Sequence, residues 1–154
     1  MGKFNFLLKQ IDGSDAEFVQ DNESKSRKGV LRGLHMQFNH TQAKLVRVIN
    51  GEVWDVAVDV RKKSPTFGQW HGVLLSDENK KQFFVPEGFL RGFVVLYETA
   101  TFVYKCAHLY EPTDEYSMAW DDKDIGVEWP TTEVQFFEKD KKNHSLAELK
   151  EKMK

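Results

Sequence analysis

The stretch KLVRVINGEVWDVAVDV (Lys44–Val60) decides the fold class. It holds two apolar runs separated by Asn50 and Gly51, and an Asn-Gly pair between two such runs is a strong signal for a tight hairpin. In the second run, Trp and Val occupy alternate positions, so one face of an extended strand is apolar while the other carries Asp55 and Asp59. The pattern predicts two antiparallel strands that pair with each other, the second having one dry face and one face with two carboxylates.

Further short apolar runs follow at close spacing, each bounded by Gly, Pro or a charged turn. They are Phe67–Ser76, Gln82–Gly88, Gly92–Tyr97 and Thr101–Tyr110. No helical pattern lies between them, which favours an all-β sandwich or barrel over alternating βαβ units. Capping-box spacings near the two ends predict a short helix or turn over Asp15–Phe18 and a small helix from Leu146 onward.

Length and composition are typical of a single domain spanning residues 1–154, because 154 residues with 40% hydrophobic content bury one core and not two. The 22 basic and 24 acidic side chains leave a formal charge of −2, which predicts no nucleic-acid partner. No apolar run approaches the ~20 residues of a membrane helix, and residues 1–10 do not resemble a signal peptide, so we expect no membrane partner. The one cysteine, Cys106, cannot form an internal disulfide, which indicates a reducing compartment and favours the cytoplasm.

The sequence motifs predict neither a metal site nor a cofactor. Local pairs such as His-x-His, which zinc and iron sites usually use, do not occur among the five histidines. The sequence also lacks the Gly-x-Ser-x-Gly elbow of hydrolases and the glycine-rich phosphate loops. Asp55 and Asp59 have the spacing for a paired-carboxylate glycosidase, but such carboxylates on a strand more often are solvated or bind neighbouring Arg and Lys side chains.

Acid–base chemistry at His35 remains open on the residue pattern alone. His35 lies in GVLRGLHMQ (Gly29–Gln37), three residues after Arg32, where glycines are mixed with basic groups. An anionic substrate and an imidazole that titrates near neutral pH can meet in such a segment. The alternative is a structural histidine beside a surface arginine, and the pattern does not decide between the two.

Long strings of residues carry a resemblance to a known family. They are FVQDNESKSRKGVLRGLHMQ, KLVRVINGEVWDVAVDVRKKSPTFGQW, VPEGFLRGF and TFVYKCAHLYEPTDEYSMAWDDKDIGVEWP. From about Phe18 to Asp140 the chain resembles the dTDP-4-dehydrorhamnose 3,5-epimerase family. The resemblance implies an antiparallel jelly-roll barrel of the cupin type, here with short terminal helices.

The same resemblance implies four catalytic residues. His35 of RGLH corresponds to the base, and Asp140 of FFEKD to the carboxylate that orients it. A base held in this way keeps one tautomer, and its protonated form is stabilised. Tyr104 of the YK pair corresponds to the acid, and Lys44 to the cation that stabilises the enolate.

Substrate contacts are implied at Gln20, Asn22, Arg32 and Tyr110, and Arg91 is expected to bind a phosphate or a sugar oxygen of the substrate. Of these, Arg32 corresponds to a ligand of the diphosphate and Tyr110 to an aromatic ring that stacks on the nucleotide base. The reaction implied is epimerisation at C3 and C5 of a nucleotide-linked 4-keto-6-deoxyhexose in deoxysugar biosynthesis, by proton exchange without metal or nicotinamide. A nucleotide-diphosphate sugar is the expected substrate, and a homodimer the expected assembly.

Two features depart from the family pattern. Arg91 stands where the family usually has a pocket histidine, and an arginine cannot transfer a proton near neutral pH. The N-terminal arm of the family, which reaches the nucleotide of the neighbouring subunit, is expected to be absent. These departures leave open a 3,4-ketoisomerase acting on the same substrates, and a non-catalytic sugar-nucleotide-binding or subunit-partner protein.

Overall fold

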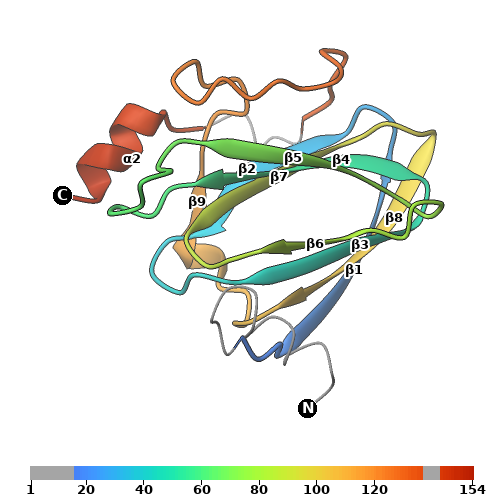
Figure 1. Ribbon diagram of the computed structural model, residues 1–154, viewed down its shortest axis with the longest axis horizontal. Helices are drawn as coiled ribbons and strands as arrows, with labels where there is room; N and C mark the ends of the chain where they lie inside the picture. Colours follow the sequence, from blue (N-terminus) through green and yellow to red (C-terminus); the bar gives the residue numbers. More distant parts are fainter. Residues whose placement is uncertain (1–15, 137–142) are drawn as a thin grey trace.

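Two antiparallel β-sheets face each other in this protein, whose computed structural model describes residues 16–136 and 143–154 (Figure 1). The four-stranded sheet has the order β1 (Gln20–Arg27), β8 (Thr99–Cys106), β3 (Lys44–Asn50) and β6 (Gln82–Val85). The five-stranded sheet has the order β5 (Trp70–Ser76), β4 (Glu52–Asp59), β7 (Phe89–Val95), β2 (Leu31–Gln37) and β9 (Glu115–Ser117). A 3₁₀ helix, η1 (Pro112–Asp114), and one α-helix, α2 (Leu146–Lys152), complete the described elements. The predicted all-β class is confirmed.

The predicted hairpin at Asn50-Gly51 is wrong, although both of its strands exist. Strand β3 pairs with β6 and β8 in one sheet, whereas β4 pairs with β5 and β7 in the other. The chain crosses from sheet to sheet at Gly51, whose φ of +83° suits glycine. A β-carbon on Gly51 would lie 2.1 Å from the carbonyl oxygen of Thr99, so the corner also needs a residue without a side chain.

The two helix predictions had different outcomes. Residues 16–18 are not helical, and Asp15 lies outside the described residues. The backbone N–H of Val19 already donates to the carbonyl of Cys106 at 2.9 Å, so the chain joins the four-stranded sheet directly. Helix α2 is confirmed, because Ser145 and Glu148 form the expected capping box at its start.

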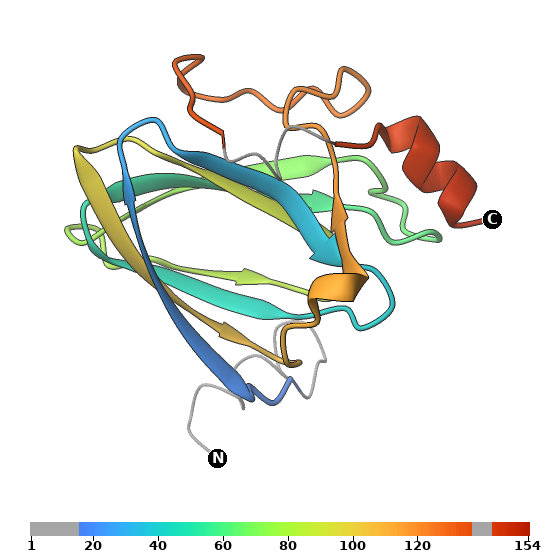
Figure 2. The ribbon, with the colours of Figure 1, turned by 180° about the vertical axis from the view of Figure 1, so that it is seen from behind.

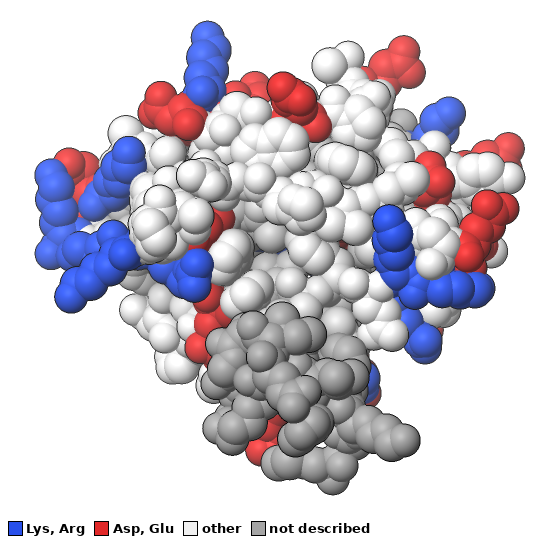
Figure 3. Space-filling model, in the orientation of Figure 1, with Lys and Arg blue, Asp and Glu red and all other residues white. Residues whose placement is uncertain are grey.

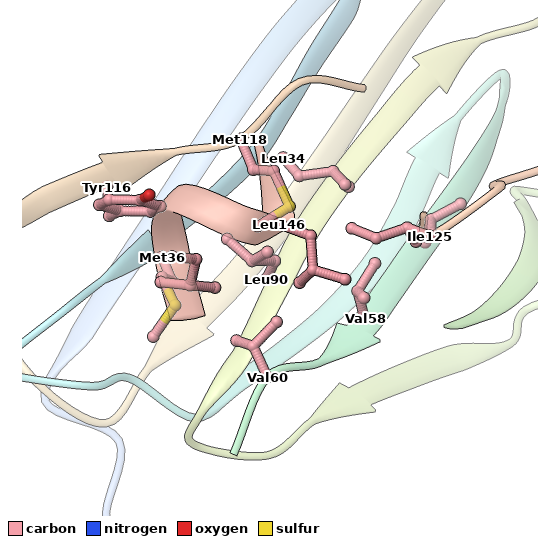
Figure 4. Packing of buried hydrophobic residues seen from close by; sticks show 11 residues of the cluster. Leu34, Met36, Val58, Val60, Leu90, Tyr116, Met118, Ile125 and Leu146 are labelled. Atoms are coloured by element: carbon pink, nitrogen blue, oxygen red, sulfur yellow. The ribbon is translucent and has the colours of Figure 1, made fainter. Parts of the chain in front are cut away.

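The outer face of the five-stranded sheet is covered by α2 and by residues 118–129 (Figure 2). Leu146 of α2 belongs to one buried cluster with Val58 and Leu90, whose side chains leave the sheet toward it (Figure 4). Met118 and Ile125 join the same cluster. The apolar face that the alternation in β4 predicts is therefore a real core face, but it lies outside the sandwich.

The space between the sheets changes from apolar to polar along the strands. Nine buried apolar residues fill one end: Val30, Val46, Val48, Val53, Leu75, Phe93, Val95, Ala100 and Phe102. The strand faces that carry these residues become polar toward the other end. Lys44 lies two positions from Val46 on the same face of β3, and Tyr104 lies two positions from Phe102 on the same face of β8. The polar end of this interior is where a site can form.

Asp55 and Asp59 do not form a carboxylate pair. Both are buried, with 0% and 2% exposure, and each binds its own arginine. Asp55 accepts hydrogen bonds from Arg91 inside the sandwich, whereas Asp59 accepts them from Arg61 in the loop that follows β4. Each carboxylate of β4 is thus already paired with an arginine, and the glycosidase interpretation has no support.

Candidate active site

One cavity of about 280 Å³ lies at the polar end of the sandwich, close to the lower limit of ligand pockets, ~300 Å³. Its lining includes eight of the nine residues expected from the sequence: Gln20, Asn22, Arg32, His35, Lys44, Arg91, Tyr104 and Tyr110. Asp140, the ninth, lies outside the described residues. A larger surface hollow, beside Phe84 and Leu109, contains none of the expected catalytic residues.

A register shift in β2 places Arg32 and His35 on the same side of the sheet. Residues three apart on a regular strand face opposite sides. Here Arg32 is opposite Phe93 of β7 and His35 is opposite Arg91, with an irregularity between the two pairs. One residue is inserted on β2, as in a β-bulge, and both side chains therefore reach the cavity.

The opposing sheet contributes its residues in regular rows. Asn22 of β1 lies opposite Tyr104 of β8, and Gln20 lies opposite Cys106. On the other side of β8, Cys106 lies opposite Lys44 of β3. The cavity therefore sets Lys44 and Tyr104, from the four-stranded sheet, against His35 from the five-stranded sheet.

A buried ion pair forms part of the cavity wall. The Nε of Arg91 donates to Oδ1 of Asp55 at 3.0 Å, and Nη2 of Arg91 donates to Oδ2. Burial raises the pKa of the Asp55 carboxyl, and the charge and hydrogen bonds of Arg91 counteract that rise. The fork of two hydrogen bonds fixes the orientation of the guanidinium group.

Burial shifts the pKa values of three further groups in the cavity: Lys44, Tyr104 and Cys106. It lowers the pKa of Lys44, and the positive charge of Arg91 lowers it further. It raises the pKa of Tyr104, against the opposing charge of Arg91, and it also raises the pKa of the Cys106 thiol. Tyr104 therefore holds its proton at neutral pH and is a group able to donate it.

Tyr110 stands at the exposed rim of the cavity. It is 49% exposed, its hydroxyl donates to Oε2 of Glu115 at 2.9 Å, and its backbone N–H donates to Oε1 of Gln20 at 2.8 Å. Burial and the hydrogen bond to Glu115 raise the pKa of Tyr110 to about 12. The ring is held at its hydroxyl end, and it remains open to contact.

Sequence reasoning missed Asp55, Glu115 and Gln42 as parts of this site. Asp55 binds Arg91, and the other two line the cavity. Strand alternation puts Asp55 on the inward face of β4, and this signal could have found it. Glu115 belongs to a strand of three residues, which is too short for a periodic pattern to predict.

Metal-binding clusters and membrane-spanning helices are both absent from the described residues. No group of three His, Cys, Asp or Glu residues within 16–136 and 143–154 is placed to hold a metal ion. Among the same residues, no helix is long and apolar enough to cross a membrane. On the face shown in Figure 3, Lys and Arg side chains lie mainly toward the edges, and the central part is largely uncharged.

Comparison with known proteins gives a consistent result. The family model for dTDP-4-dehydrorhamnose 3,5-epimerase matches residues 4–148. The Methanothermobacter thermautotrophicus protein of that name is 50% identical over 151 residues, covering 98% of this chain and 82% of its own length. The Salmonella typhimurium protein is 56% identical over 128 residues, covering 82% and 70%.

Solved structures agree with this result. The dTDP-4-dehydrorhamnose 3,5-epimerase from Elizabethkingia anophelis superposes with a TM-score of 0.90 at 47% identity, covering 94% of this chain and 81% of that one. The dTDP-6-deoxy-D-glucose-3,5-epimerase from Legionella pneumophila superposes with a TM-score of 0.84 at 52% identity, covering 88% and 73%. These likenesses confirm the cupin-like jelly roll. The chain belongs to the dTDP-4-dehydrorhamnose 3,5-epimerase family.

Proposed function

We propose that this protein epimerises a dTDP-linked 4-keto-6-deoxyhexose at C3, at C5 or at both, in deoxysugar biosynthesis. The observation that carries the proposal is the meeting of His35, Lys44 and Tyr104, from three strands of two sheets, in one cavity. The related Legionella pneumophila enzyme was crystallised with dTDP-4-keto-L-rhamnose, a sugar of this class. The reaction requires only proton transfer, so neither metal nor nicotinamide is needed.

His35 acts as the base in this proposal. The protons at C3 and C5 are both acidified by the C4 ketone between them, so one base can serve either carbon after the sugar has turned. Asp140 orients the imidazole of His35, as the family resemblance implies. Removal of either proton leaves an enolate whose negative oxygen needs a nearby cation.

Lys44 supplies that cation, and Tyr104 returns a proton from the other side. Lys44 and Tyr104 belong to the sheet opposite His35, which supports proton delivery to the face that the base does not occupy. The raised pKa of Tyr104, caused by burial, keeps its hydroxyl protonated before the transfer. Inversion at carbon follows when the proton leaves on one face and returns on the other.

The nucleotide part of the substrate extends toward the rim. Arg32 binds the diphosphate, since a guanidinium group suits phosphate oxygens. Gln20 and Asn22 contact the substrate along β1, and Tyr110, with its exposed ring, stacks on the base. Arg91 faces the sugar from β7.

The chain acts as a single domain and as a homodimer in the cytoplasm. The two sheets share one interior, which supports a single domain. Within residues 16–136 and 143–154, strand β1 pairs with β8 alone, which supports a second chain pairing along its other edge. The single cysteine supports a reducing compartment.

Solvent-deuterium exchange tests the proposed reaction. In D₂O the protein should place deuterium at C3, C5 or both in dTDP-4-keto-6-deoxyglucose, read by NMR of the sugar. His35→Asn should slow this exchange about 10²–10⁴-fold, the usual worth of a general base. His71→Asn is the matched control, because His71 is an exposed histidine on β5 that does not line the cavity.

Two outcomes overturn the proposal. A sugar nucleotide that binds without any deuterium uptake identifies a non-catalytic binding protein. A product whose ketone has moved to C3 identifies a 3,4-ketoisomerase.

A further inference from the structure

Arg91 is nearly buried and is held in place by a forked hydrogen-bonded pair with Asp55. Its side chain is 8% exposed, and two of its three nitrogens donate to Asp55, which is completely buried. Because β2 and β7 are adjacent, Arg91 also lies directly across from His35 in the register. A guanidinium group cannot release its proton near neutral pH, so Arg91 is a permanent and fixed charge in the cavity wall.

The guanidinium group also lies over aromatic rings of the site. Its carbon is 5.6 Å from the ring centre of Tyr104, 5.4 Å from that of Phe93 and 5.7 Å from that of Phe102. These distances are within the range of a cation–π contact. Asp55 fixes Arg91, and Arg91 in turn restrains the ring of Tyr104.

Other charged groups surround Tyr104 as well. Those that act on it or share its cavity are Arg32 and His35 of β2, Lys44 of β3, Cys106 of β8, Tyr110 and Glu115. After burial, the charge of Arg91 has the largest influence on the pKa of Tyr104, and it lowers that pKa. No other single charged neighbour acts on the pKa of Tyr104 as strongly as Arg91.

We propose that Arg91 is a positioning residue for the proposed reaction: it holds the ring of Tyr104 and places a fixed positive charge beside it, and Asp55 fixes Arg91 and partly balances that charge. This inference rests on the proposed function for its consequence in catalysis. The electrostatic relationship among the three residues can be measured without substrate. Asp55 and Arg91 should influence Tyr104 in opposite directions.

The opposite effects expected of Arg91 and Asp55 on the titration of Tyr104 provide the test of this inference. In protein labelled with ¹³C at tyrosine Cζ, the titration of Tyr104 is assigned among the four tyrosines with Tyr104→Phe. Arg91→Met removes the positive charge and should raise the midpoint by about one pH unit. Asp55→Asn leaves the positive charge of Arg91 unbalanced and should lower the titration midpoint of Tyr104. If packing alone mattered, both variants would loosen the same contact and shift Tyr104 in the same direction, and this result overturns the inference.

Arg61 provides the matched control, because it forms the same forked pair with Asp59 and lies over the ring of Phe89 at 4.8 Å, away from the cavity. Arg61→Met should leave the midpoint of Tyr104 unchanged. If a single variant at the buried pair does not fold, the double variant Arg91→Met/Asp55→Asn removes both charges without leaving either unpaired. It should raise the midpoint of Tyr104 above that of the wild type, and an unchanged midpoint overturns the inference.

The pH profile of deuterium exchange connects the inference to catalysis. Its alkaline limb should move up in Arg91→Met and down in Asp55→Asn, in step with the NMR midpoints. Midpoints that move while the wild type exchanges no deuterium contradict the proposed function and leave the inference about Arg91 intact. Normal exchange with midpoints that do not move contradicts the inference alone.

Discussion

Gly33 and Gly92 touch across strands β2 and β7, immediately beside the cavity. A β-carbon on Gly33 would lie 2.5 Å from the α-carbon of Gly92 and 2.8 Å from the carbonyl oxygen of Arg91. Gly33 also has a φ of +123°, a conformation that other residues rarely adopt. This contact allows the register shift that brings Arg32 and His35 to one side.

Gly33→Ala should therefore damage both stability and activity. The added methyl group meets backbone atoms that cannot turn away, so we expect a loss of about 2–4 kcal/mol in the free energy of unfolding. Gly126→Ala is the control, since Gly126 also has a positive φ of +66° but its β-carbon would lie 3.9 Å from the nearest atom. Urea unfolding of the two variants shows how much the close contact and the less accessible φ of Gly33 add to the cost of replacing a glycine with positive φ. Equal losses would show that the contact with Gly92 does not matter.

The all-β class of the fold could be predicted from the sequence, but the pairing of its strands could not. Alternation in β4 and the short runs around β5 to β8 indicate strands whatever their neighbours, because side chains on a strand alternate in direction. Asn50-Gly51 also fits a corner between sheets, and only long-range partners for β3 decide that it is one. Strand β1 has charged residues at alternate positions and no apolar run, so no local signal announces it.

The site could be predicted from the family strings but not from local pattern. Eight of its residues come from five strands (β1, β2, β3, β7 and β8) and from the rim, and only the folded sheets bring them together. The link between Asp55 and Arg91 spans 36 positions and two strands. The inward placement of both Arg32 and His35 depends on the register shift, which strict alternation contradicts.

Replacement of Leu149 on α2 tests whether this helix shares the apolar cluster on the outer face of the five-stranded sheet. It is fully buried in the cluster that covers the five-stranded sheet. Leu149→Ala should lower the free energy of unfolding by about 2–5 kcal/mol, since it removes buried apolar volume and leaves a cavity. Leu74→Ala is the matched control. Leu74 is 37% exposed, so its replacement should lower the free energy of unfolding much less. Similar losses in thermal unfolding would mean that α2 does not share the core.

Asp59 should make stability depend on pH in the acid range. Burial opposes ionisation of Asp59, but hydrogen bonds from Arg61, Ser64 and Thr66 hold its pKa well below the usual value. A lowered carboxyl pKa stabilises the fold above the unfolded value of about 3.9, and this contribution is lost as the pH falls below it. Asp59→Asn should thus lose about 1–3 kcal/mol at pH 7, with a deficit that shrinks below about pH 4. The exposed Asp121→Asn should show neither effect in urea unfolding.

The buried charge of Lys44 should lower the free energy of unfolding of this protein. Burial, and then the charge of Arg91, lower its pKa, so the folded protein binds its proton less tightly than the unfolded chain. The resulting penalty is complete below the lowered pKa and vanishes as the pH rises through the unfolded value of about 10.4. Lys44→Met should therefore increase the free energy of unfolding at pH 7, lose this advantage toward pH 10, and abolish deuterium exchange. Lys105→Met, at an exposed position on β8, should stay within about 0.5 kcal/mol of the wild type at every pH. A Lys44→Met protein less stable than the wild type at pH 7 would mean that the charge of Lys44 is fully compensated in the folded state.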